Sequence, residues 1–303
     1  MARANGTALA LPALALGDAT GDSDGMPGFY DNDVVARFDT PLKLDDELPD
    51  VAALHRMLLR RTHRQYAPRV VPEGLVAVLI AAALSTSSKS DFQQASIIRV
   101  DDPGKRAELA ALIPAMPWIG AAPVFFVFCG DARRLERIGE LRGHPEPNGR
   151  LEGFFNAAVD AALVMQTFIL AAETVGLGCC PISVIRNHAD RAGEILELPD
   201  KVFPVAGLCV GWPANEGHIS LRLPPAVTLH RDRYDDTALP ELVDAYDRAR
   251  DRRHSLPREE QRNPARFGYA DFYGWSEDKA RQAAQPEGGA FAPWLRRHGF
   301  TFD

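Results

Sequence analysis

Arginine and threonine are concentrated in one short segment, residues 60–64, which reads RRTHR. Arg60, Arg61 and Arg64 supply three guanidiniums, and Thr62 adds a hydroxyl beside them. The planar donor fork of a guanidinium matches phosphate oxygens, and a threonine hydroxyl is a further short donor. The segment therefore predicts an anion site, although a solvated basic surface has the same composition.

A second polar cluster, residues 85–94 (STSSKSDFQQ), combines hydroxyl, ammonium, carboxylate and amide side chains. Together they offer both donors and acceptors, which the edge of a heteroaromatic ring requires. A polar loop between a helix and a strand has a similar composition, so that alternative stays open. A third feature is Arg222, in SLRLP, just after an apolar run that ends in GWP. A lone loop arginine is usually solvated, so only the combination of all three features indicates a ligand.

Periodic patterns place these clusters at or near the ends of predicted helices and strands. Helices are predicted over residues 45–66, 72–88, 150–178 and 190–199 from apolar spacing and end signals. Strands are predicted over residues 95–103, 122–131, 179–185 and 203–213 from apolar, β-branched and aromatic runs. The run at 123–130 indicates a strand covered on both faces. The longest helix is apolar nearly all round and is expected to end at Gly176.

Composition divides the chain into three parts. Residues 1–45 are rich in Gly, Asp and Ala and predict a flexible extension, with a processed leader as the alternative. Residues 46–235 contain the alternating helices and strands of an α/β or α+β core. Residues 236–303 are mostly charged and close with the aromatic tail AFAPWLRRHGFTFD. Such a tail is expected to pack on the core or on a partner subunit.

Charge and cysteine content exclude several classes of protein. The net charge of -7 argues against nucleic acid or anionic lipid as a partner. Apolar windows are broken before the roughly 20 residues that a membrane span needs. The 4 cysteines lie in apolar stretches without metal-site spacing, which predicts reduced, inert thiols, no metal and a cytoplasmic location. Neither a dinucleotide fingerprint nor a P-loop is present.

Six segments in order carry a resemblance to a known family: RRTHR, STSSKSDFQQASIIRV, APVFFVFCGD, DAALVMQTFILAAETVGLG, LPDKVFPVAGLCVGWP and LRLP with HRDRY. In this order they resemble the FMN-dependent nitroreductase family, and within it the branch of oxygen-insensitive NADPH nitroreductases and flavin reductases. The resemblance covers roughly residues 50–235, and YGWSEDKARQ with the closing WLRRHGF is similar to that branch's C-terminal arm.

The resemblance implies an α+β, three-layer nitroreductase-like fold in which helices flank a central mixed sheet. It also implies an intertwined homodimer with FMN sites at the subunit interface. The implied activity is ping-pong reduction of a small electron acceptor (nitroaromatics, quinones or flavins) by NADPH or NADH through flavin N5. No side chain need be catalytic in that chemistry. A specialised flavoenzyme (dehalogenation, flavin fragmentation or ring reduction) and a flavin-binding protein without fast turnover remain alternatives.

The resemblance also implies roles for individual residues. Phosphate and ribityl contacts fall on Arg60, Arg61, Thr62 and Arg64, and the second phosphate arginine is Arg222. Contacts with the flavin ring fall on Ser88, Lys89, Ser90 and Gln93. The segment over the flavin is Pro181, Ile182, Ser183 and Val184, which departs from the branch pattern and puts the natural acceptor in question.

Two further departures concern charge. Ser220 stands where the branch usually has a lysine, and Lys89 stands in a run that is normally serine. An ammonium at position 89 that reached the flavin N1–C2=O edge would stabilise the reduced anion and raise its potential. The alternative is a lysine that points to solvent.

Overall fold

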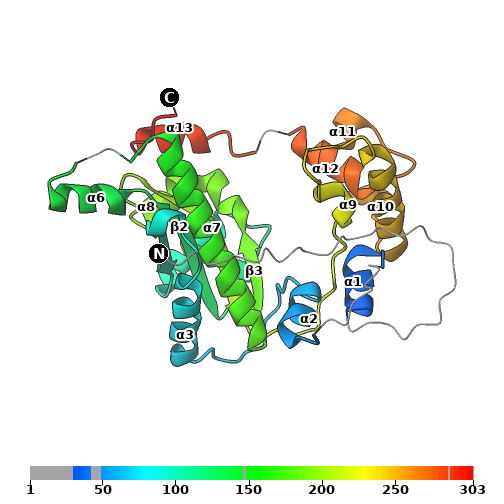
Figure 1. The fold of residues 1–303 in the computed structure, drawn as a ribbon, viewed down its shortest axis with the longest axis horizontal. Helices are drawn as coiled ribbons and strands as arrows, with labels where there is room; N and C mark the ends of the chain where they lie inside the picture. Colours follow the sequence, from blue (N-terminus) through cyan, green and yellow to red (C-terminus); the bar gives the residue numbers. More distant parts are fainter. Residues whose placement is uncertain (1–29, 42–48, 146–147, 286, 303) are drawn as a thin grey trace, which may run out of the picture. The chain divides into compact units, whose positions relative to one another are not determined.

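The computed structural model describes residues 30–41, 49–145, 148–285 and 287–302 (Figure 1). The chain forms two compact units. The first, called the sheet unit below, comprises Arg60–His218 and Ala283–Asp303, and the second, called the helical unit, comprises Met1–Leu59 and Ile219–Gln282.

The sheet unit is built on four strands in the order β1-β2-β4-β3. They are β1 (Ala95–Arg99), β2 (Val124–Asp131), β3 (Gly178–Ile182) and β4 (Val202–Gly211). All three strand pairings are antiparallel, so among the described residues the sheet is antiparallel and not the mixed sheet that the family resemblance implied. Neighbouring strands run in opposite directions across the whole order β1-β2-β4-β3. In the described residues, parallel pairing is limited to one bridge, between Thr62 and Cys179.

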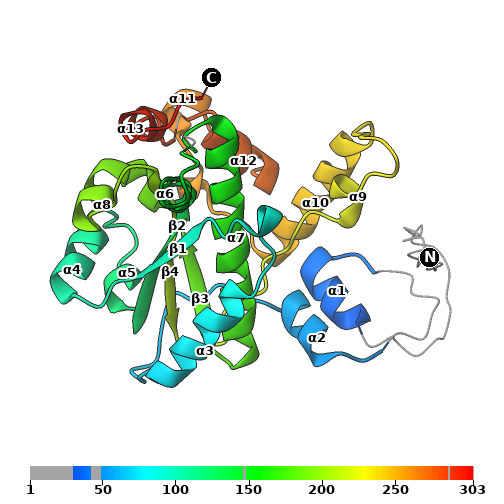
Figure 2. The same ribbon diagram turned by 60° about the vertical axis from the view of Figure 1, so that its left-hand side comes forward.

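Side chains alternate across β2 and form two separate cores, as the period of a strand requires. Phe126 and Phe128 pack with side chains of α3 (Glu73–Leu84) and α7 (Leu151–Thr174). Phe125 and Val127 pack with α4 (Pro103–Ala111), α5 (Trp118–Ala121) and α8 (Ala189–Ile195). All of β2 is buried, as its apolar run predicted. The result is the predicted three-layer arrangement of helices, sheet and helices (Figure 2).

Helix α7 has 24 residues, about 36 Å at 1.5 Å per residue. It ends beside Gly176, whose φ of 85° lies in the left-handed region, as the sequence predicted. A row of apolar side chains at four-residue spacing is exposed: Leu151 (52%), Phe155 (60%), Val159 (38%) and Leu163 (40%).

By length and composition, α7 is also the one helix of the described residues that could cross a membrane, which the sequence windows did not indicate. Its buried residues include Ala161, Phe168 and Ala172, which pack with the sheet. Packing in the core of the sheet unit therefore accounts for the buried apolar face of α7.

The aromatic tail of the chain packs on the sheet unit. Helix α13 (Phe291–Arg297) buries Trp294 in a cluster with Phe203 and Phe300. The main chain is tied down by two hydrogen bonds, from Lys201 N to His298 O (2.9 Å) and from Thr301 N to Gly149 O (2.7 Å).

The helical unit contains a helix that the sequence did not predict, α1 (Asp31–Phe38), within the segment expected to be a flexible extension. Residues 1–29 and 42–48 of that segment lie outside the described residues. The other helices of the unit are α2 (Ala52–Leu58), α9 (Pro225–Thr228), α10 (Leu239–Arg253), α11 (Pro264–Phe267) and α12 (Trp275–Ala283). Leu221, Tyr246 and Ala249 form a small core, against which Trp275 packs.

Candidate functional site

The arginine segment, residues 60–64, follows α2 and runs along the free edge of β3. Thr62 bridges Cys179, and His63 N donates to Cys179 O at 3.1 Å. Gly178 permits this approach, because a Cβ at that position would lie 2.7 Å from the His63 side chain. Main-chain pairing thus fixes the segment and leaves its side chains available for other contacts.

The guanidiniums of the arginine segment contact neighbouring side chains. Arg60 pairs with Glu173 at 3.1 Å, and Arg61 pairs at 3.0 Å with Glu216, which is 82% exposed. Arg64 lies over the Trp118 ring, 5.5 Å from its centroid.

Buried nitrogen atoms without a described partner favour a bound ligand at this segment. Arg61 Nε and His63 Nδ1 are buried atoms without a hydrogen-bond partner among the described residues. The pKa of His63 is lowered by burial and then by the positive charges of Arg61 and Arg60. A buried polar atom without a partner is costly, and a cationic segment attracts anions. The residues present therefore fit a phosphate group.

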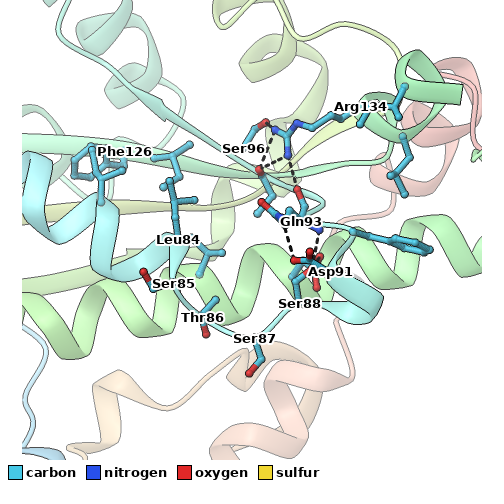
Figure 3. A pocket seen from close by; sticks show the side chains of 18 of the residues that line it. Leu84, Ser85, Thr86, Ser87, Ser88, Asp91, Gln93, Ser96, Phe126 and Arg134 are labelled. Carbon is cyan, nitrogen blue, oxygen red and sulfur yellow. Dashed lines mark hydrogen bonds between the residues drawn. The ribbon is translucent and has the colours of Figure 1, made fainter. Parts of the chain in front are cut away.

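The polar cluster (residues 85–94), here called the ring loop, leads into the opposite edge strand, β1. A cavity of about 940 Å³ opens there, between α3, α6 (Arg133–Arg142), α7 and the start of β1 (Figure 3). Its polar lining consists of Ser85, Thr86, Ser87, Ser88, Asp91, Gln93, Ser96, Arg99, Arg134 and Asp160. Apolar side chains, among them Leu84 and Phe126, complete it.

The ring loop has a strained backbone. Ser90, Asp91 and Gln93 have φ values of 48°, 59° and 53°, in the left-handed region that side-chain-bearing residues rarely adopt. Such conformations persist only when the surroundings over-determine them, and they concentrate at functional sites.

Asp160, on α7, is one of the groups that impose this conformation. It is 1% exposed and accepts hydrogen bonds from Ser88 Oγ (2.8 Å), Lys89 N (3.1 Å) and Gln94 N (2.9 Å). Sequence reasoning missed this residue. The available signal was a single carboxylate in the middle of an apolar helix, since a buried charge needs several partners.

Arg134, on α6, holds the other side of the ring loop. Its guanidinium donates to the main-chain oxygens of Gln93 and Ala95 and to Ser96 Oγ (Figure 3). It also pairs with Asp131 at 2.9 Å. The loop is thus clamped between a buried carboxylate and a guanidinium. Sequence reasoning missed Arg134 as well, because an arginine in the first turn of a charged helix gives no pattern of its own.

The remaining predicted residues are distributed as follows. Lys89 Nζ pairs with Glu152 Oε1 at 2.8 Å, and these side chains are 48% and 72% exposed. Pro181 and Ser183 are exposed where β3 passes into a 3₁₀ turn (Ser183–His188), whereas Ile182 is buried and Val184 half-buried. Ser220 and Arg222 belong to the helical unit, where Arg222 is exposed and its Nη1 lies 3.3 Å from Leu221 O.

Within one chain, the arginine segment and the ring loop are not brought together. Arg60 binds Glu173 and Ser88 binds Asp160, two acidic residues of the same helix α7. The 13 positions between these residues correspond to about 20 Å along the helix. The two segments therefore contact α7 at well-separated positions of the same chain.

The four cysteines are free and buried, and burial raises the pKa of each thiol, to about 12 for Cys129. The described residues contain no cluster of three or more acidic, histidine or cysteine side chains that could hold a metal ion.

Three features characterise the class of protein: a three-layer α+β fold, an arginine segment on one sheet edge and a strained polar loop beside the other edge. The sequence matches the Nitroreductase family over residues 58–212 and the Nitroreductase family, C-terminal domain, over residues 220–303. The chain therefore belongs to the nitroreductase family.

Two enzymes have sequences similar to that of this chain. An FMN reductase (NADPH) from Bacillus subtilis is 36% identical over 183 residues, which are 60% of this chain and 74% of that protein. An oxygen-insensitive NADPH nitroreductase from Salmonella typhimurium is 37% identical over 175 residues, 57% of this chain and 71% of that protein.

Solved structures agree with this assignment. NfrA2 from B. megaterium has a TM-score of 0.74 at 31% identity, covering 84% of this chain and 100% of its own. The NADPH:FMN oxidoreductase from Vibrio harveyi, complexed with NAD⁺, has a TM-score of 0.72 at 27% identity, covering 82% and 98%.

Proposed function

We propose that this protein is an NAD(P)H-dependent FMN oxidoreductase that reduces nitroaromatics, quinones or flavins. Membership of the nitroreductase family and the names of the similar enzymes support this activity. The observation that carries the proposal is the arginine segment, where Arg61 Nε is a buried donor and His63 Nδ1 a buried ring nitrogen, both without a hydrogen-bond partner among the described residues. FMN supplies the redox chemistry when bound, taking hydride from the nicotinamide and passing it to the acceptor.

The chain's own residues bind and orient the cofactor. Arg60, Arg61, Thr62 and Arg64 hold the phosphate and ribityl groups, because their donors match phosphate oxygens. Ser88, Lys89, Ser90 and Gln93 offer donors and acceptors to the ring edge. Pro181, Ile182, Ser183 and Val184 line the acceptor side. Ser220 and Arg222 form a second phosphate arm, a role that rests on the family resemblance.

We propose that the enzyme is a homodimer in which each FMN uses the arginine segment of one copy and the ring loop of the other. The contacts that the arginine segment and the ring loop of one copy make with α7 are about 20 Å apart along the helix. This separation supports the sharing of each site between two copies. The exposed apolar row Leu151, Phe155, Val159 and Leu163 supports it too, since contiguous apolar surface of this kind favours a protein interface.

The proposal includes a location and a preferred reductant. Four free, buried cysteines suit a reducing compartment such as the cytoplasm. NADPH is proposed over NADH because the similar enzymes are named for NADPH. The small acceptor itself stays defined only by class.

The test is a titration of purified protein with FMN, followed by gel filtration, light scattering and steady-state assays. The expected outcome is one FMN retained per chain, a dimer mass, and rapid NADPH oxidation with several nitro compounds and quinones. Retained FMN without turnover on this panel would favour a specialised flavoenzyme or a flavin-binding protein. Failure to retain any flavin would overturn the proposal.

A further inference from the structure

The segment 220–222, which carries the proposed phosphate arm, is held by a helix that precedes the family's matched region. Helix α1 lies outside both matches, which begin at residues 58 and 220. Arg37 of α1 is 5% exposed, and Arg222 N donates to its main-chain oxygen at 2.9 Å. The backbone of Arg222 is therefore hydrogen-bonded directly to α1.

The side chain of Arg37 makes a second link to the same segment. Its Nη1 donates to Ser220 O at 2.7 Å, and its Nε donates to Leu58 O at 2.8 Å. One buried guanidinium thus joins α1, the end of α2 and the residues before Arg222. Hydrogen bonds from a charged group to buried carbonyls are stronger than neutral ones, so this junction is stiff.

The opposite side of the segment is anchored independently. Leu221 is 4% exposed in the small core of the helical unit, and Tyr246 Oη donates to Leu221 O at 3.1 Å. With Ser220 and Arg222 bound by Arg37 and Leu221 bound by Tyr246, the backbone cannot shift without breaking several bonds. The Arg222 side chain, in contrast, is exposed.

Helix α1 is itself fixed at both ends, so it can serve as a support. At its C-terminal end, Arg253 donates to Ala36 O (2.8 Å) and Val35 O (3.0 Å), and Asp39 pairs with Arg252 at 3.1 Å. Cations at a helix C-terminus also interact favourably with its dipole. Near its N-terminal end, the His55 imidazole contacts Asp33 and Asp50.

We propose that Arg37 is a positioning residue for recognition of the FMN phosphate: through α1 it fixes the backbone of residues 220–222, the segment that carries Arg222. This inference rests on the proposed function, which assigns Arg222 to that group. It predicts that damage to Arg37 weakens recognition of the phosphate specifically, because the flavin ring is bound by other residues.

Riboflavin provides the discriminating probe, because it has the ring and ribityl chain of FMN without the phosphate. Dissociation constants for FMN and riboflavin are measured on full-length wild type, Arg37→Met, Arg37→Lys, Arg222→Ala and the double variant Arg37→Met/Arg222→Ala. A purely structural loss weakens both ligands equally. A positioning loss lowers the preference for FMN over riboflavin.

A matched control exists in the same unit. Arg281 is 4% exposed and donates to two carbonyls, Arg262 O (3.1 Å) and Gly268 O (2.7 Å), but it does not bind residues 220–222 in any described contact. Arg281→Met therefore removes a comparable buried guanidinium. It should lower the thermal midpoint about as much as Arg37→Met and leave the FMN preference unchanged.

The expected result is an FMN preference reduced about a hundredfold by Arg222→Ala and about tenfold by Arg37→Met. Arg37→Lys should lie between Arg37→Met and wild type, and the double variant should match Arg222→Ala. The inference is overturned if Arg37→Met leaves the preference unchanged while Arg222→Ala lowers it, or if Arg281→Met lowers it equally. An Arg222→Ala variant with unchanged preference would instead remove Arg222 from the site, and wild type that binds neither ligand would overturn the proposed function.

Discussion

The arginine segment and the ring loop are both polar, but the fold holds them in different ways. The arginine segment is fixed by main-chain pairing with β3. Its conformation therefore does not depend on which side chains it carries, and these can be suited to ligand binding. The ring loop adopts left-handed backbone conformations and is fixed by side chains, chiefly those of Asp160 and Arg134. The backbone of the arginine segment should therefore tolerate changes of its side chains but be sensitive to steric clashes at β3. The backbone of the ring loop depends instead on single residues that are distant in sequence.

The largest expected effect is on the ring loop. Asp160→Ala removes the acceptor of three hydrogen bonds and leaves their donors unsatisfied. We expect a loss of about 3–5 kcal/mol in unfolding free energy. Urea denaturation measures this, and hydrogen exchange should show faster exchange at the amides of Lys89 and Gln94. Asp160→Asn, which keeps one acceptor, should lose less. A loss below about 1 kcal/mol for the alanine variant would contradict the anchoring role.

The next effect is on the arginine segment. Gly178→Ala places a Cβ 2.7 Å from the His63 side chain and should push the segment away from β3. We expect a destabilisation of about 1–3 kcal/mol together with weaker FMN binding. Gly74→Ala is the control, because a Cβ there meets nothing within 4 Å. Unchanged FMN affinity in Gly178→Ala would mean that the pairing with β3 does not position the phosphate donors.

A smaller effect concerns Lys89, whose pairing with Glu152 competes with any contact to the flavin ring. Removal of a cation near the reduced flavin should lower the FMN midpoint potential, by roughly 20 mV for about 1 kcal/mol. Spectroelectrochemistry of Lys89→Ser measures this shift. Glu152→Gln frees the ammonium and should move the potential the opposite way. If both variants keep the wild-type potential, Lys89 serves only its ion pair.

The smallest effect is confined to mildly acidic pH and to the arginine segment. Folding lowers the pKa of His63 from its ordinary value of 6.5. The contribution of the neutral His63 side chain to folding stability is therefore complete above pH 6.5 and is lost as the pH falls toward the folded-state pKa. Thermal midpoints measured across this range should therefore decline less in His63→Gln than in wild type. His144→Gln, at an exposed position, is the control. Parallel acid limbs for wild type and His63→Gln would sink the prediction.

The elements that the sequence predicted are those whose pattern is local. The apolar run of β2 and the nearly all-apolar helix that ends at Gly176 determine their own structure, and both lie where predicted. Helix α1 was not predictable in this way. It has eight residues, and it is held by Arg37, Asp39 and their partners, which are far apart in sequence.

The candidate site shows the same division. The residue types of the arginine segment and the ring loop were sufficient to mark both as candidates, because phosphate and ring edges require those donors. Asp160 and Arg134 escaped notice, since their importance arises from bonds to residues about 40 to 70 positions away. The strand directions did not follow from the residues, because a helical connection does not by itself fix how the chain re-enters a sheet.

The spacing along α7 has a genetic consequence. If each FMN takes its arginine segment from one copy and its ring loop from the other, an Arg61→Ala chain and a Ser88→Ala chain damage every site in their own homodimers. A mixed pair of these chains gathers both defects into one site and leaves the other site with no altered residue. Two alleles that are each defective should therefore complement each other when they are expressed together. At most half of the sites in every mixed dimer would be free of altered residues.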